Sequence, residues 1–213
     1  MGSEMCIRDR DAVIQATAGS VGVNANSYTD ITNVALAISG SGGGNSVGGT
    51  LALNMFLTDK RAIVGSSDTQ DNNISLNAGQ AVNIGVDAKQ EIINGILSAS
   101  ISTSSNAISG ALSANVVKGE SYALANRGAD INDNTTLAAS ATSQSVGVTA
   151  QDNTTITDLT GTIAASSSNS VGVALGGNVF WKDVKAGVNS RVVADQNVDV
   201  TADTSQNLSL IHI

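Results

Sequence analysis

The side chains in this sequence that could cleave a polysaccharide are its carboxylates. Two of them in one groove, or one beside a metal ion or a basic residue, could cleave a polysaccharide as a lyase or a hydrolase does. One set is scattered along the chain, mostly beside Asn: Asp68, Asp71, Asp130, Asp133, Asp152, Asp195 and Asp199. A second set recurs at one repeat position: Asp59, Glu120 and Asp183. We expect solvated turn acids in the first set and a structural role for the second, so no catalytic residue is assigned.

Metal and cofactor sites are not expected either. The single Cys6 and the single His212 stand near opposite ends of the chain, so they cannot build a metal cluster or a disulfide framework. Asp and Asn in turns could offer oxygen ligands to Ca²⁺, but the G-G-x-G-x-D motif is absent. The glycine-rich segment 39–44 lacks the Lys-Ser/Thr of a phosphate-binding loop.

One segment could bind a partner by direct contact. Phe180, Trp181 and Lys182 combine two aromatic residues with a cation, and Trp181 is the only Trp of the chain. Aromatic side chains are enriched where surfaces bind partners, so this trio is a candidate contact for a host-cell protein or a glycan. The alternative, which we favour, is that Phe180 packs inward and Trp181 seals the fold.

The element that positions these residues is a recurring strand. Segment 45–54 (N-S-V-G-G-T-L-A-L-N) returns at 106–115 and at 169–178. In the first copy Val47, Gly49, Leu51 and Leu53 alternate with small or polar residues, and this period of two predicts a strand with one apolar face. We expect the apolar face to line a core and the small face to lie outward.

Each copy of this strand ends in Asn. Asn tolerates the left-handed backbone conformation and caps turns with its side-chain amide. We therefore predict structural turn residues at Asn54, Asn115 and Asn178.

Other segments recur at the same interval of about 62 residues, for example V-G-V-N-A at 21–25, I-G-V-D-A at 84–88 and V-G-V-T-A at 146–150. Residues 11–208 thus form a single unit of three repeats, at approximately 21–83, 84–145 and 146–208. The patterning predicts an all-β fold, a β-solenoid in which each repeat holds about five short strands and two or three coils.

The unit G-N-S-V-G-G-T-L-A-L-N, followed by N-[IV]-x-[LV]-x-A, resembles the repeat region of large bacterial filamentous adhesins of the leukotoxin-like and filamentous-haemagglutinin type. The resemblance implies a right-handed parallel β-helix that is secreted or displayed on the bacterial cell surface. It also implies a longer parent chain, in which this segment mediates adhesion or acts as an extended stalk. The alternative function is a carbohydrate-active enzyme built on a β-helix.

Composition excludes some partners. The formal net charge is −8 with only 10 Lys and Arg, so we expect no basic surface that could bind a phosphate backbone. Nucleic acid is therefore not an expected partner. No run of 18 apolar residues occurs, so no membrane span is expected in this segment. Residues 1–10 (MGSEMCIRDR) and 209–213 (SLIHI) differ in amino-acid composition from the rest and are predicted to be non-native terminal sequence.

Overall fold

The computed structural model describes residues 12–66, 74–133 and 144–213. These residues form strands and connections only, which confirms the predicted all-β class. Because the described residues form no helix, none of them supplies a membrane-spanning helix. The strands are β1 (Val13–Ala16), β2 (Val21–Ser41), β3 (Ser46–Val64), β4 (Ile74–Ala78), β5 (Ala81–Ser102), β6 (Ala107–Ala125), β7 (Ala129–Ile131), β8 (Ser145–Ser166), β9 (Ser170–Val188), β10 (Arg191–Val192) and β11 (Val198–His212).

These strands form three parallel sheets. Sheet A has the order β1-β4-β7-β10, sheet B the order β11-β8-β5-β2, and sheet C the order β3-β6-β9. Neighbours within a sheet are therefore three strands apart along the chain. Each repeat contributes one strand to each sheet, so the expectation of about five short strands and two or three coils per repeat is wrong.

Strand pairing follows the predicted sequence repeats residue by residue in sheet C, where Leu51 pairs with Leu112 and Leu112 with Leu175. In sheet B the register differs by two residues from the predicted match of 21–25 with 84–88 and 146–150. Val23 pairs with Ile84, and Ile84 with Val148. Similar residues consequently stack in rows that run across the strands, because the register is parallel and the spacing of the repeats is nearly constant.

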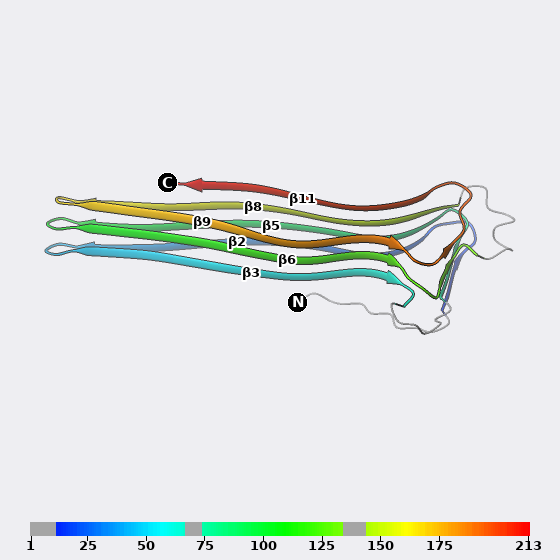
Figure 1. Ribbon diagram of the computed structural model, residues 1–213. Helices are drawn as coiled ribbons and strands as arrows, with labels where there is room; N and C mark the ends of the chain where they lie inside the picture. Colours follow the sequence, from blue (N-terminus) through cyan, green and yellow to red (C-terminus); the bar gives the residue numbers. More distant parts are fainter. Residues whose placement is uncertain (1–11, 67–73, 134–143) are drawn as a thin grey trace.

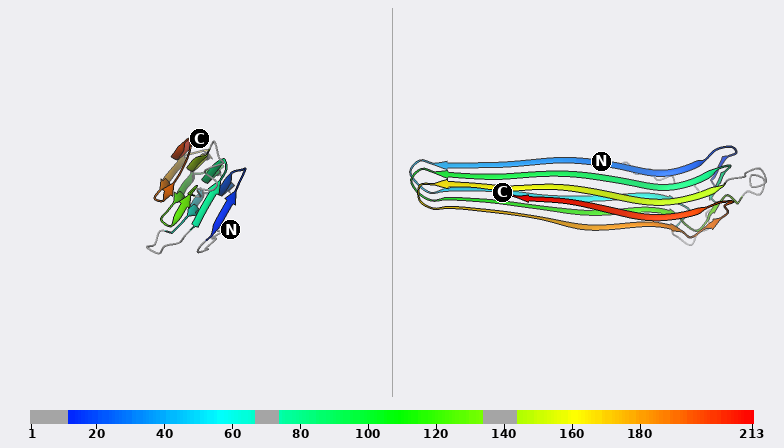
Figure 2. Two further views of the ribbon diagram at one scale, coloured as in Figure 1. Left: turned by 90° about the vertical axis from the view of Figure 1, so that its right-hand side faces the viewer. Right: turned by 90° about the horizontal axis from the view of Figure 1, so that it is seen from above.

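The molecule is long and flat (Figures 1 and 2). Sheets B and C lie face to face over its length, and short turns join their strands at one end. Sheet A lies at the other end. A strand such as β5, with 22 residues, extends over about 70 Å at the usual rise of a β-strand.

An apolar core fills the end where sheet A meets the two long sheets. Ala62 and Val64 from sheet C, Leu76 from sheet A, and Val82 and Ile84 from sheet B are all buried there. Side chains from three walls converge on this volume, and most of them are aliphatic; the buried Gln144 and Asn132 bond to the backbone of Ala78 beside them. This part of the fold has the apolar interior that the sequence predicts.

Farther along, the two faces of the recurring strand are reversed relative to the prediction. Ala52 is 7% exposed and Leu53 is 67% exposed. Ser46 is buried, while Val47 and Leu51 on the alternate face are exposed. The small and polar set therefore lies between the sheets and the aliphatic set faces outward. The physical reason is that the inward Ser, Asn and Asp side chains bond to one another across the narrow gap, as described below.

Of the two terminal segments predicted to be non-native, the structure describes only 209–213. Residues 1–10 lie outside the described residues. Ser209 to His212 continue β11 and pair with β8, and Ile213 donates its backbone N–H to the carbonyl of Thr160 at 3.0 Å. The predicted boundary at residue 208 therefore falls within a strand, and the proposed non-native origin of 209–213 stays a prediction.

Candidate functional site

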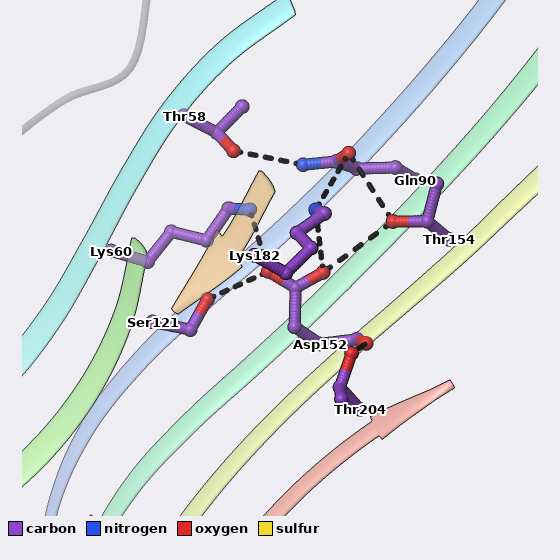
Figure 3. Close-up of polar contacts among 8 residues, drawn as sticks. All are labelled: Thr58, Lys60, Gln90, Ser121, Asp152, Thr154, Lys182 and Thr204. Carbon is purple, nitrogen blue, oxygen red and sulfur yellow. Dashed lines mark hydrogen bonds and ion pairs between the residues drawn. The ribbon is translucent and has the colours of Figure 1, made fainter. Parts of the chain in front are cut away.

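A charged cluster lies in the interior between sheets B and C (Figure 3). Strand alternation turns Asp152 of β8 inward from sheet B, and it turns Lys182 of β9 and Lys60 of β3 inward from sheet C. We call the eight residues in contact here the Asp152 cluster: Thr58, Lys60, Gln90, Ser121, Asp152, Thr154, Lys182 and Thr204.

Asp152 is the centre of this cluster and is fully buried. Its Oδ1 accepts a hydrogen bond from Lys182 Nζ at 2.8 Å, and its Oδ2 accepts one from Ser121 Oγ at 2.8 Å. Lys182 Nζ also donates to Gln90 Oε1 at 3.1 Å, and Gln90 Nε2 donates to Thr58 Oγ1 at 2.9 Å. The carboxylate therefore joins the two sheets through a buried, charge-assisted network.

A glycine in the central strand makes room for the lysine. Gly119 of β6 pairs with Thr58 on one side and with Lys182 on the other. A Cβ on Gly119 would lie 3.0 Å from Lys182 Nζ and 3.0 Å from Thr58 Oγ1. Since no side chain fills this position, Lys182 can extend along the stack toward Gln90 and Asp152.

Lys60 is the least satisfied member of the cluster. Its Nζ lies 3.8 Å from Asp152 Oδ2, its side chain is 7% exposed, and the described residues give this nitrogen no hydrogen-bond acceptor. Burial lowers the pKa of Lys60 below its ordinary value, and the attraction of Asp152 opposes this only in part. Two amines thus share one carboxylate.

A second buried carboxylate lies nearer the turns. Asp158 of β8 is fully buried and accepts hydrogen bonds from Ser113 Oγ at 2.9 and 2.8 Å. Asn94 and Asn115 approach it at 3.4 Å each. Within the described residues, the side chains that contact this carboxyl group are neutral hydrogen-bond donors.

The three Asn residues predicted at turns lie within strands instead. Asn54, Asn115 and Asn178 stand in β3, β6 and β9, and Asn54 Nδ2 donates to Asn115 Oδ1 at 2.8 Å. Asn115 Nδ2 in turn donates to Asn178 Oδ1 at 2.7 Å. The turn prediction is corrected by this geometry: identical amides stack in register and form an internal ladder.

The predicted contact trio is divided between two faces. Trp181 is 62% exposed on the outer face of sheet C. Phe180 packs inward against Ile92, Val117 and their neighbours, and Lys182 belongs to the Asp152 cluster. Consecutive residues of a strand point to opposite sides, so the three cannot form one patch. The inward packing of Phe180 agrees with the interpretation favoured above, while Trp181 does not seal the interior.

The recurring acids form an outward row on sheet C. Asp59 pairs with Glu120 and Glu120 with Asp183 in the strand register. Arg61 bonds Asp59 at 2.7 Å and Glu120 at 2.9 Å. Hydrogen bonds from Lys185 and then from Tyr122 hold the pKa of Asp183 below its ordinary value. These acids are therefore paired surface groups.

The scattered acids do not converge in the part of the chain that is described. Asp133 Oδ2 accepts from Arg191 Nη1 at 2.8 Å, whereas Asp68 and Asp71 lie outside the described residues. The described Asp, Glu, His and Cys side chains form no group of three that could hold a metal ion. A shallow depression of about 460 Å³ is lined by residues 127–130 and 188–191. It holds Arg127 and Arg191 with Asp130, and so lacks the pair of carboxylates that glycosidic cleavage needs.

The Asp152 cluster was not apparent in the sequence. Asp152 was grouped with the turn acids, and Lys182 was assigned to an outward patch with Trp181. The available signal was strand parity, because Lys182 stands one residue from Trp181 and must point to the other face. Comparison with family models, with curated proteins and with solved structures finds no match to this chain.

Proposed function

We propose that this chain is a non-enzymatic repeat segment of a large exported bacterial adhesin of the leukotoxin-like or filamentous-haemagglutinin type. In this proposal the three sheets are the walls of a right-handed parallel β-helix, a β-solenoid. The observation that carries the proposal is the continuous register between repeats, in which 19 residues of β3 pair with β6 and the same number of β6 pair with β9. Such stacking is the way a repeat protein extends.

The proposed solenoid is wide and lengthens slowly. Each repeat of about 62 residues adds one layer of about 4.8 Å, so a stalk of 100 Å needs about twenty repeats. This ratio agrees with a very large parent chain and gives each layer a broad outer surface. The segment therefore suits the display of lateral binding surface as well as the spacing of a distal domain.

A non-enzymatic role is supported by where the described carboxylates lie. Asp152 and Asp158 are enclosed between the sheets, and Asp59, Glu120 and Asp183 each bond to a cation or a tyrosine. A carbohydrate-active enzyme needs two accessible carboxylates that face one substrate. Among the described residues, Asp30 and Glu91 are neighbours in the register on the outer face of sheet B, so the enzyme alternative would have to use this pair or one elsewhere in the parent chain.

The proposed location is the bacterial cell surface or the extracellular medium, and the proposed partner is a host-cell protein or glycan. Trp181 is the contact residue that the geometry favours, because it is a large exposed aromatic on the outer face of sheet C. Tyr28 on sheet B provides a matched control, since it is also 62% exposed.

Beads coated with the chain test this proposal. They should bind host cells or a glycan panel without releasing cleavage products. Trp181→Ala should reduce binding by more than about tenfold, as expected for an exposed aromatic anchor, while Tyr28→Ala should leave it unchanged. Release of unsaturated or reducing sugars would favour the enzyme, and equal binding by all three proteins would remove Trp181 from the contact.

A further inference from the structure

The outer face of sheet C carries a continuous apolar band. It consists of the outward odd positions 47–55 of β3, the even positions 108–116 of β6 and the odd positions 171–179 of β9. Every one of these positions holds Gly or an apolar residue. The large side chains among them that lie open to solvent are between 43% and 70% exposed. Exposed apolar patches of this extent mark interaction surfaces. We call this surface the sheet C band.

The rows of the band form ridges and a groove. Leu51, Leu112 and Leu175 stack in one row across the three strands. The neighbouring row contains Gly49 and Gly110 on two of the strands. A ridge of leucines beside a shallow row of glycines can interdigitate with an identical surface at the usual spacing of packed sheets, about 10 Å.

The interior beneath the band does not supply a large apolar core. The buried hydrophobic cluster at this level contains only Ala52, Ile96 and Ala111, and polar Ser and Asn side chains surround it. In this half of the molecule most large aliphatic side chains are on the outside. Hydrophobic stabilisation of this half therefore requires that the outer face be covered.

Charge marks the end of the band. The next outward row of sheet C is Leu57, Lys118 and Trp181, and it is followed by Asp59, Glu120 and Asp183 and then by Arg61, Tyr122 and Lys185. If a second copy packed with its strands antiparallel, the two bands would overlap. The two charged halves would then project past each other into water, and the acidic rows would not face one another.

The size of the band favours a second copy as the cover. The band presents on the order of 1,000 Å² of surface, comparable with the ~800 Å² that each partner buries in a standard interface.

From these observations we infer that the sheet C band is a self-association interface, on which a second copy of this chain packs face to face with its strands antiparallel. The two-fold axis runs along the leucine row. Leu112, on the central strand, is then close to Leu112 of the other copy.

Sedimentation equilibrium of the full chain tests the interface directly. The triple variant Leu51→Thr, Leu112→Thr, Leu175→Thr keeps β-forming residues and should weaken self-association by more than about thirtyfold, the effect of losing buried anchors. The control Ile38→Thr, Ile101→Thr, Ile163→Thr makes the same kind of change on the outer face of sheet B and should leave association intact. A circular dichroism spectrum of each variant establishes that the strands remain.

A cross-linking experiment holds even if the triple variant does not fold. In a Cys6→Ser background, which removes the only native thiol, Leu112→Cys should give a covalent dimer with a short thiol cross-linker, whereas Ile163→Cys should not. The inference is overturned by a chain that stays monomeric at high concentration or by dimers that depend equally on both faces. It is also overturned if the chain stays monomeric and uses the sheet C band to bind phosphatidylcholine vesicles in a flotation experiment.

Discussion

Lys182 Nζ donates a 2.8 Å hydrogen bond to Asp152 Oδ1 across the space between sheets C and B. Both side chains are almost completely buried, so this pair is a polar connection between the two sheets. Its position between the apolar end core and the layer of Phe180 and Ile92 makes it a structural element of the interior.

Removing the charge of Asp152 should destabilise the fold. Asp152→Asn leaves Lys182 and Lys60 without a buried counter-charge, and breaking such a pair costs about 3–5 kcal/mol of the free energy of unfolding. Urea denaturation followed by circular dichroism measures this loss. Asp183→Asn, on the exposed row, should leave the urea midpoint nearly unchanged. Similar midpoints for the two variants would show that the Asp152 pair is not buried as described.

Gly119 should be intolerant of even one methyl group. Gly119→Ala places a Cβ against Lys182 Nζ and Thr58 Oγ1, which forces the lysine away from Asp152 and should cost about 1–3 kcal/mol. Gly40→Ala is the control on the outer face of sheet B, because the nearest atom to its added Cβ is the carbonyl oxygen of Ile101 at 3.9 Å. The comparison requires only the melting temperatures of the two variants. A stable Gly119→Ala protein would contradict the path assigned to Lys182.

Lys60 should make stability depend on alkaline pH. Its folded-state pKa is lowered, so the unfolded chain binds more protons between that pKa and the ordinary value near 10.5, and stability rises with pH in this window. Lys60→Met removes the buried amine and should stabilise the fold by about 1 kcal/mol at neutral pH. The difference between wild type and variant should shrink as pH approaches the ordinary value. A difference that stays constant or widens would indicate a charged, well-solvated Lys60.

Substitutions of Asn115 distinguish a role in the amide ladder from a role in a turn. Asn115→Ala removes the amide that bonds both Asn54 and Asn178, and unsatisfied buried partners should cost about 1–3 kcal/mol. Asn115→Gly should cost still more, because Gly destabilises a strand interior; at a left-handed turn it would be tolerated. Asn106→Ala, in an exposed ladder, should change the free energy of unfolding by less than about 0.5 kcal/mol.

The repeat pattern predicted the strand class, and in sheet C the pairing partners, because both depend on local periodicity and on identity at fixed intervals. In sheet B the predicted register is wrong by two residues, since Val23 and not Val21 pairs with Ile84. Asn54, Asn115 and Asn178 are equivalent in the sequence and stack in the structure. The number of layers per repeat was not predictable in the same way. Strands of 19 to 22 residues are far longer than the usual five or six, so several short strands were assumed where one long strand forms.

Which face lies inside could not be obtained from alternation alone. A period of two places Leu51 and Ala52 on opposite faces of the strand but does not determine which face lies inside. Which face lies inside depends on contacts between the sheets, such as the hydrogen bond from Asn94 Nδ2 to Ser113 Oγ at 2.6 Å, which join different strands. The Asp152 and Lys182 pair was hidden for the same reason, since it also requires the empty position at Gly119.

Thiol accessibility at two consecutive residues of β5 tests the inverted interior most directly. Leu97 is 39% exposed on the outer face of sheet B, and Ser98 is fully buried between the sheets. In a Cys6→Ser background, Leu97→Cys should react with a maleimide at nearly the rate of a free thiol. Ser98→Cys should react more than about a hundredfold more slowly, because labelling requires opening of the sheets. A fast Ser98→Cys beside a protected Leu97→Cys would mean that the aliphatic face lies inside, and would contradict the structure on which the account rests.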